Sequence, residues 1–284
     1  DFDGQPYSNQ SNVWSSNNGG NGVDLFAYTA QLGNGLSASI AAENNYGHRL
    51  GVSTVAGTVE AVGGQTMPDI VANLRIDQAW GSAQVMGAAH ETNYGGLIGG
   101  PSDQTGYAFG AGVKVNLPML GKGDYIQGQF TYGVGAIDYV GSGLGNAQTR
   151  VQSGTSSFGP GFDSVVTGAG SADLTTGWSI TGGYEHNWVP GWKTSLYGAY
   201  GKLEYSAAAS AALRAPVAAL TAVGSSADWS YWQVGSRTVW TPVTNLDLSV
   251  EVMYQKQDSA FTGPTVSDNS WWSGMFRAQR NFYP

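Results

Sequence analysis

The residues that could support catalysis or metal binding are few and widely spaced. The chain has three histidines, His48, His90 and His186, and no cysteine. None of the histidines has HExxH spacing, and no GxSxG nucleophile elbow is present. His90 and Glu91 are adjacent, so on a strand their side chains would point to opposite faces. We therefore predict no enzyme activity, no cofactor and no metal site.

Polar and charged residues instead alternate with apolar ones along extended segments. In residues 69–77, Asn73, Arg75 and Asp77 alternate with Ile70, Ala72, Leu74 and Ile76, and residues 107–117 and 246–254 repeat the pattern. A strand separates two such sets onto opposite faces, whereas a helix would scatter them. The side chains predicted to line a polar interior are Arg75, Asp77, Lys114, Glu185, Arg237, Asp247, Glu251 and Arg277.

The composition fits a membrane barrel better than a soluble domain. Charged residues make up 11% of the chain, glycine occurs 43 times, and the hydrophobic share is 41%. No stretch approaches the roughly 18 apolar residues of a spanning helix. The richest segment, Ala207–Val223, contains Arg214 and Pro216 and reads as a small-residue loop. A net charge of −8 argues against nucleic acid as a partner, because phosphate binding needs a basic patch.

Collecting the alternating runs predicts about eleven strands, most of them near the 9–11 residues that a tilted strand needs to cross a bilayer. Their ranges are 23–32, 36–44, 68–78, 82–92, 104–116, 124–136, 173–187, 192–204, 227–240, 246–256 and 269–282. The connections alternate in length: short turns such as Gly33-Asn34-Gly35 are followed by long segments such as 45–67, 137–172 and 205–226. This two-level pattern predicts an all-β, transmembrane, antiparallel up-and-down β-barrel.

Many of the tryptophans fall near predicted strand ends or on apolar faces. We interpret them as interfacial aromatic residues, with sugar-stacking platforms as the alternative. They are Trp178, Trp188, Trp232, Trp240 and Trp272. In residues 192–204 both faces carry aromatics, so the alternation assigns no inward side there.

Several stretches resemble the alphaproteobacterial porins of Brucella, Rhizobium and their relatives. They are Leu25–Ser39 (LFAYTAQLGNGLSAS), Asn73–Ser82 (NLRIDQAWGS), Trp192–Gly201 (WKTSLYGAYG) and Phe276–Phe282 (FRAQRNF). The resemblance covers nearly the whole chain in the same order. One departure is at the end, where Tyr283 and Pro284 follow Phe282, whereas family members commonly finish on Phe.

The resemblance implies a trimeric barrel of about sixteen strands, an even number as in other bacterial single-chain barrels. With eleven strands in this sequence, five would precede Asp1. Residues 1–22 would then be the second half of an inward constriction loop, with Asp1 and Asp3 in its aromatic-acidic part, and residues 1–284 would form one barrel domain.

Together these observations predict an outer-membrane porin, a water-filled channel for passive diffusion of small hydrophilic solutes and ions. Its expected partners are the lipid bilayer, lipopolysaccharide and two further copies of itself. The excess of acidic residues suggests a modest cation preference, although the charged wall residues could equally be solvated side chains with little influence. The alternatives are a non-conducting barrel that acts as an adhesin or receptor through its loops, and a secreted carbohydrate-binding protein.

Overall fold

The structure is a computed structural model. It describes residues 7–9, 14, 23–44, 46, 49–53, 59–60, 66–94, 100–141, 148–152, 154–215, 226–261, 263 and 266–282. Asp1, Asp3 and His48 lie outside the described residues.

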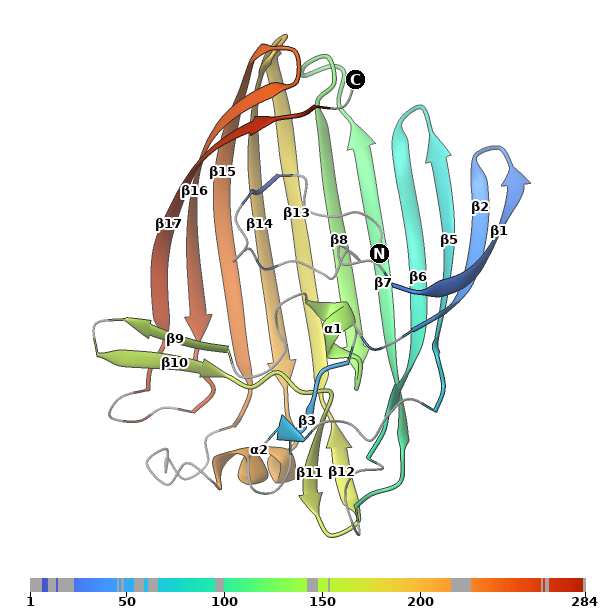
Figure 1. Ribbon diagram of the computed structural model, residues 1–284, viewed down its shortest axis with the longest axis vertical. Coiled ribbons are helices and arrows are strands. Elements are labelled where there is room, and N and C mark those ends of the chain that lie inside the picture. Colours follow the sequence, from blue (N-terminus) through green and yellow to red (C-terminus); the bar gives the residue numbers. More distant parts are fainter. Residues whose placement is uncertain are drawn as a thin grey trace.

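The main element is an antiparallel sheet of eleven strands (Figure 1). Within this sheet, each strand pairs with the sheet strand that follows it in the chain. The strands are β1 (Leu25–Gly33), β2 (Leu36–Glu43), β5 (Asp69–Gln78), β6 (Gly81–Thr92), β7 (Gln104–Asn116), β8 (Tyr125–Val134), β13 (Thr176–Val189), β14 (Trp192–Glu204), β15 (Trp229–Val243), β16 (Leu246–Asp258) and β17 (Asn269–Arg280). Each corresponds to one predicted strand, with differences of a few residues at the ends. The fold class is confirmed.

Short turns connect the strands at one end of the sheet, which is the top of Figure 1. In the first turn Gly33, Asn34 and Gly35 all have positive φ, at 89°, 51° and 76°. Asn245 has a φ of 65° between β15 and β16. Glycine and asparagine adopt this left-handed conformation at the least steric cost, which explains their positions in tight hairpins.

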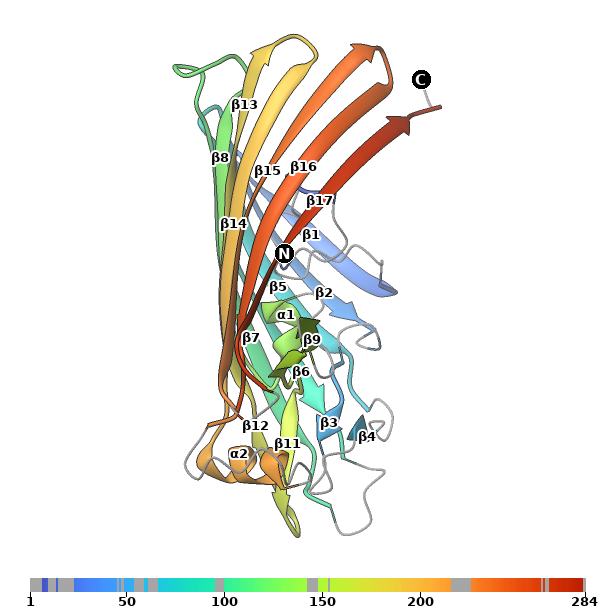
Figure 2. The same cartoon turned by 90° about the vertical axis from the view of Figure 1, so that its left-hand side faces the viewer.

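The sheet curves into a trough, and parts of the long connections lie on its concave side (Figure 2). They contain α1 (Ile137–Val140), β9 (Gln148–Gln152), β10 (Thr155–Gly159), β11 (Ser164–Gly168), β12 (Ser171–Leu174), β3 (Val52–Ser53) and β4 (Val59–Glu60). Strands β3 and β11 pair in parallel, which links two connections far apart in the chain. The long connections therefore contain regular structure of their own, which the sequence analysis did not predict.

Helix α2 (Ala207–Arg214) corrects the prediction of a loop over 207–223 within its described part. The Ser206 side chain accepts a hydrogen bond from the Ala209 N–H and caps the helix. The helix itself is rich in alanine, the best helix former, and it buries Ala212 and Leu213. Neither described helix has the length and hydropathy that crossing a membrane requires.

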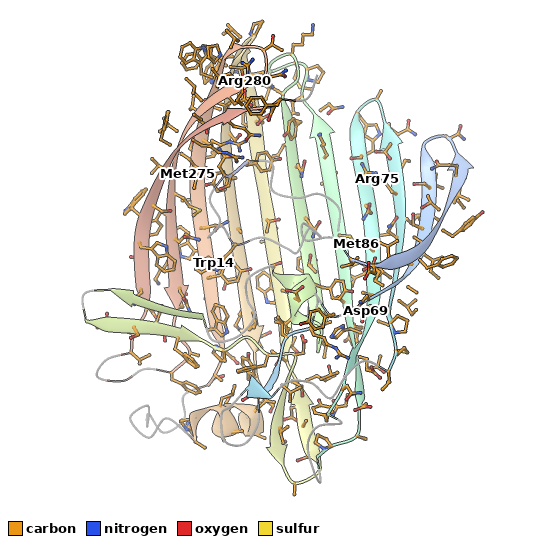
Figure 3. The ribbon with its side chains drawn as sticks, viewed as in Figure 1. Trp14, Asp69, Arg75, Met86, Met275 and Arg280 are labelled. Carbon is orange, nitrogen blue, oxygen red and sulfur yellow. The ribbon has the colours of Figure 1, made fainter. Side chains whose placement is uncertain are left out.

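A hydrophobic core fills the trough near the long connections. Trp14, Ile137, Phe162 and Leu203 are buried in it with Tyr231. Because β14 and β15 contribute their inward side chains, the connections are packed against the wall of the sheet. Figure 3 shows Trp14 in this half of the trough and Arg75 on the opposite wall.

Candidate functional site

The two faces of the sheet differ in chemistry. Large apolar side chains are exposed on the convex face, as expected where a surface contacts lipid. They include Ile70, Leu74, Val85, Phe109, Val113, Ile126, Ile180, Leu196, Val234, Val250, Val252 and Phe276. The concave face carries the alternate positions, which are mostly polar.

Aromatic residues form a row across the loop ends of seven strands on the convex face. Neighbouring rings lie within contact distance: Trp178 and Tyr200 are 5.2 Å apart between centroids, and Tyr254 and Trp272 are 5.0 Å apart. The row contains Tyr107, Tyr132, Trp178, Tyr200, Trp232, Tyr254 and Trp272. At the turn end, Trp188 is exposed and Trp192 stacks on Trp240 at 5.5 Å.

This arrangement puts the five predicted interfacial tryptophans at two levels of the convex face. From Trp232 to Trp240, β15 advances eight residues, or about 26 Å along the strand at roughly 3.3 Å per residue, which is about 20 Å of height for a strand tilted by roughly 40°. An apolar band about 25 Å tall between two aromatic girdles is typical of outer-membrane barrels. Their role at a membrane interface remains a prediction.

A polar row crosses the concave face at one level of the sheet. The strand register places Tyr125 opposite Glu185, Glu185 opposite Ser195, Ser195 opposite Arg237, and Arg237 opposite Glu251. At one end of the row, the Lys114 ammonium lies 4.2 Å from the centroid of the Tyr125 ring. At the other end, Glu251 lies opposite Met275 of β17, and Arg277 of β17 lies one pair further along, opposite Ser249 of β16.

The Glu185 carboxylate contacts two basic side chains and one hydroxyl at this level of the wall. Its carboxylate accepts hydrogen bonds from Lys193 Nζ at 3.2 Å and Ser195 Oγ at 3.1 Å. Arg237 Nη2 lies 3.9 Å from the same carboxylate. Since Glu185 and Arg237 are both buried, each compensates part of the other's charge, as buried charges require.

The described amino-terminal residues Tyr7, Ser8, Asn9 and Trp14 lie against this wall. Glu251 accepts hydrogen bonds from the Ser8 hydroxyl and from the Asn9 backbone N–H, the latter at 2.8 Å. The Tyr197 hydroxyl donates to the same carboxylate. A carboxylate has lone pairs for several donors, so Glu251 can join the amino-terminal segment to β14 and β16.

Inner-wall glycines make room for aromatic rings. A Cβ added to Gly183 would lie 2.9 Å from carbons of the Tyr7 ring. A Cβ added to Gly235 would lie 2.3 Å from the Tyr197 hydroxyl. Both glycines therefore leave space for an aromatic ring that a larger residue would occupy. Tyr197 reaches Glu251 because Gly235 has no side chain in its way.

The opposite wall carries a second charged pair. The Arg75 guanidinium donates from Nε and Nη2 to the two oxygens of Asp77, both at 2.9 Å. Both side chains are partly exposed to solvent, so the pair contributes little to stability. The Asp247 carboxylate, on β16, accepts a hydrogen bond from the Thr241 hydroxyl. All eight charged residues predicted to line a polar interior thus lie on the concave face, and their function there remains a prediction.

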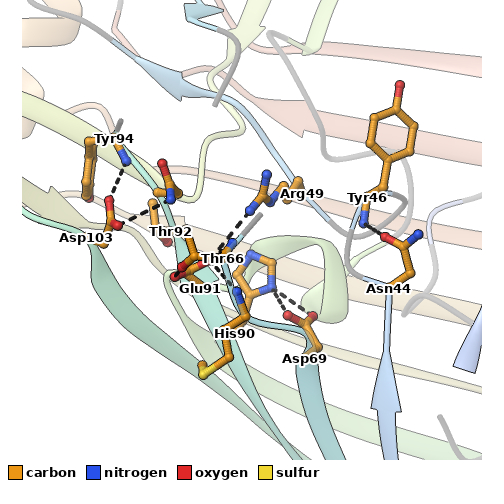
Figure 4. A network of polar contacts seen from close by, with 12 residues as sticks. Asn44, Tyr46, Arg49, Thr66, Asp69, His90, Glu91, Thr92, Tyr94 and Asp103 are labelled. Atoms are coloured by element: carbon orange, nitrogen blue, oxygen red, sulfur yellow. Dashed lines mark hydrogen bonds and ion pairs between the residues drawn. The ribbon is translucent and has the colours of Figure 1, made fainter. Parts of the chain in front are cut away.

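A buried network of polar contacts around His90 joins the long connections to β5 and β6 (Figure 4). His90 Nδ1 lies 2.8 Å from Asp69, whose carboxylate also accepts from the Tyr139 hydroxyl at 2.6 Å. Asp163 accepts the backbone N–H groups of Ile137 and Leu50 at 2.7 Å each, and lies 3.7 Å from His90 Nε2. Burial raises the pKa of the Asp163 carboxyl. This effect outweighs the hydrogen bonds and the nearby His90, which lower the pKa.

The carboxylates of Asp103 and Asp163 both accept backbone N–H groups, Asp103 from Tyr94 at 2.9 Å and Asp163 from Ile137 at 2.7 Å. Within the described part of the chain, no group of three or more His, Cys, Asp or Glu side chains could hold a metal ion.

The sequence did not reveal the contacts of Ser8, Asn9 and Trp14 with the wall. It also left open which side of β14 faces inward. The structure answers this, because Ser195 and Tyr197 contact Glu185 and Glu251 on the concave face, whereas Trp192 and Leu196 are exposed on the convex face.

An apolar convex face with two aromatic rows, a polar concave face and alternating short and long connections define the wall of a transmembrane β-barrel channel. The sequence profile of the Porin subfamily matches residues 2–281, and the chain belongs to this family. As a member of a porin family, it is a protein of the bacterial outer membrane and not an enzyme.

One solved structure supports the fold. The outer membrane channel DcaP of Acinetobacter baumannii aligns with a TM-score of 0.60 and 18% sequence identity, over 92% of this chain. The chain spans 62% of the length of that channel. No curated protein matches the sequence.

Proposed function

We propose that this porin lets small hydrophilic solutes and ions diffuse passively through a water-filled pore. The observation that carries the proposal is the polar row on the concave face, against which Tyr7, Ser8 and Asn9 are fastened. Such a wall provides hydrogen bonds and compensated charges for water and ions, and needs no energy input.

In this proposal the amino-terminal segment narrows the pore. Residues 1–22 correspond to the second half of a constriction loop, and contacts of three described residues with the wall favour this assignment. Tyr7 lies against Gly183 of β13, Asn9 binds Glu251 of β16, and Trp14 binds Gln233 of β15, so these described residues contact three strands of the wall. Solutes would then be excluded by size at this segment.

We further propose that residues 1–284 belong to one barrel domain that assembles as a homotrimer and contacts lipid and lipopolysaccharide. The apolar convex face supports contact with lipid. Phe276, Val250 and Ile180 are exposed there, and a large apolar patch of this kind is unfavourable in water.

The test is conductance of the purified full-length protein in planar bilayers, combined with liposome swelling in sugars of increasing size. Stepwise conductance and a sharp size limit are expected, and a protein without stepwise conductance would rule out the pore. Tyr7→Ala should raise the size limit. Tyr46→Ala provides the matched control, because Tyr46 is exposed in a connection.

A further inference from the structure

Three glycines lie side by side on the convex face of the sheet. The strand register places Gly128 of β8 opposite Gly182 of β13, and Gly182 opposite Gly198 of β14. The next convex position along β13 is large, since it is the exposed Ile180. A Cβ added to Gly182 would lie 2.8 Å from the Gln127 carbonyl oxygen, so a larger residue fits there only if the strands move apart. The three glycines therefore leave a groove in the apolar surface, and its floor is backbone.

This glycine groove has a volume of about 840 Å³ and is bounded by side chains from β7, β8, β13 and β14. Those that bound it include Ala111, Ile126, Phe130, Ile180, Tyr184 and Leu196. On β13, Gly182 is four residues from Trp178 and six from Trp188, or about 13 Å and about 20 Å at roughly 3.3 Å per residue. The groove thus lies between the two aromatic rows, at the depth that hydrocarbon occupies around an outer-membrane barrel.

A band of polar side chains lies on the same face, between the groove and the tryptophans of the turn end. The Tyr184 hydroxyl donates to Asp124 Oδ2 at 2.7 Å, and His186 Nδ1 lies 2.6 Å from the same oxygen. On the neighbouring strand, Thr194 Oγ1 accepts a hydrogen bond from Trp188 Nε1 at 3.0 Å. Because Tyr184 belongs both to the groove and to this polar band, the two are continuous.

One ring nitrogen of His186 remains available to a ligand. The side chain is 23% exposed. The ionised Asp124 carboxylate only accepts hydrogen bonds, so Nδ1 carries the proton that they share. In the part of the chain that the structure describes, Nε2 forms no hydrogen bond. Nε2 can therefore accept from a donor when the imidazole is neutral, or donate to a phosphate oxygen when it is protonated.

We propose that the glycine groove and the polar band bind one phospholipid of the periplasmic leaflet, with an acyl chain in the groove and the head group at His186. This inference rests on the proposed contact of the convex face with lipid. Short turns lie on the periplasmic side of outer-membrane barrels, and that leaflet consists of phospholipid, whereas lipopolysaccharide forms the opposite leaflet. The groove crosses three tilted strands, so it runs obliquely through the membrane, as a tilted acyl chain does.

An acyl chain suits this groove better than a side chain from a second copy of the protein. A methylene chain carries no polar group that must lose its partners, and it gains close contacts along the whole floor of the groove. A second copy that covered the groove would also cover the polar band. It would then have to supply a partner for His186 Nε2, because burying that atom unpaired is unfavourable. A phospholipid head group supplies this partner from the membrane surface.

The experiment is photo-crosslinking of the full-length protein in phosphatidylethanolamine vesicles that contain a phosphatidylethanolamine with a diazirine in its acyl chain. After irradiation and digestion, crosslinks should be severalfold more frequent on β8, β13 and β14 than on the convex face of β5 and β6. Ala111→Phe places a ring in the groove without adding a new Cβ, and should lower crosslinking on β8, β13 and β14 severalfold. Ala72→Phe is the matched control, because Ala72 is exposed between Ile70 and Leu74 on the convex face and outside the groove. Its crosslinks should match those of wild type.

Native mass spectra of the detergent-extracted protein provide a second measurement. Wild-type protein should retain one phospholipid, and His186→Phe should retain it severalfold less often, because the head group loses its partner while the groove persists. Crosslinks spread evenly over the convex face, or lipid binding unchanged in both Ala111→Phe and His186→Phe, would overturn the site. Retention of lipopolysaccharide in place of phospholipid would overturn the choice of leaflet. A smaller oligomer in Ala111→Phe would show that a second copy fills the groove. Expected crosslinks in vesicles without conductance would support the lipid site and contradict the pore.

Discussion

Gln233 holds both backbone polar groups of Trp14. The Trp14 N–H donates to Gln233 Oε1 at 2.8 Å, and Gln233 Nε2 donates to the Trp14 carbonyl at 2.6 Å. The amide of this side chain thus pairs with the amino-terminal segment as a neighbouring strand would. Both residues are buried, so neither hydrogen bond is readily replaced by water.

Gln233→Ala should therefore release the amino-terminal segment from β15. Removing these two buried hydrogen bonds of Trp14 costs about 1–3 kcal/mol per group, so the segment should detach more often. We expect noisier single-channel currents and faster proteolysis near the amino terminus. Gln279→Ala is the control, because Gln279 faces the same side and binds Asn281 instead of this segment. Equal current noise in the two variants would contradict the idea that Gln233 holds the amino-terminal segment on β15.

Gly235→Ala should push the Tyr197 ring away from Glu251. The new Cβ would lie 2.3 Å from the Tyr197 hydroxyl, and overpacking of this kind costs about 1–3 kcal/mol. The urea midpoint in liposomes should fall. In Gly274→Ala the nearest atom is 3.6 Å away, so that variant should stay close to wild type. In a Tyr197→Ala background, the Gly235 substitution should lose most of its effect; an undiminished effect would mean that the clash lies elsewhere.

The sheet was predictable from the sequence because its signals are local. Alternation with period two in residues such as Asn73 and Arg75 gives both the strand and the face, and Gly33-Asn34-Gly35 gives the turn. The same alternation assigns Glu251 to the inner wall. It cannot identify Ser8 and Asn9 as the donors to Glu251, since more than 240 positions separate them in the chain.

The connections were less predictable because their order depends on burial. Ala209, Ala212 and Leu213 read as part of a flexible loop until the helix that they form packs against the core. The two carboxylate neighbours of His90 come from β5 and from the connection before β11, and no local sequence pattern relates them to His90.

Spin labels at two adjacent positions of β17 should distinguish lipid from water. The chain has no cysteine, so each variant carries a single reactive thiol. A nitroxide at Phe276→Cys, on the convex face, should collide mainly with oxygen dissolved in the lipid. A nitroxide at Met275→Cys should collide mainly with a water-soluble nickel chelate, because Met275 alternates onto the concave face. Similar accessibility at the two positions would contradict the assignment of the faces.

Asp124 should contribute a pH-dependent part of the stability at the turn end. Burial would raise the pKa of its carboxyl, but hydrogen bonds from the Asn187 N–H, Tyr184 and His186 outweigh it and lower the pKa from 3.8 to about 2. The stabilisation is therefore present above pH 4 and is lost as the pH falls toward 2. We expect Asp124→Asn to lower stability by on the order of 1 kcal/mol at pH 7, after allowance for solvent screening.

The difference between wild type and Asp124→Asn should shrink as urea midpoints are measured from pH 5 down to pH 2, because both proteins then carry an uncharged group at this position. Tyr184→Phe removes one donor, the hydroxyl that lies 2.7 Å from Asp124 Oδ2. It should therefore reduce the pH dependence only in part. A gap between wild type and Asp124→Asn that stays constant over this range would mean that the carboxylate contributes through its shape and not through its charge.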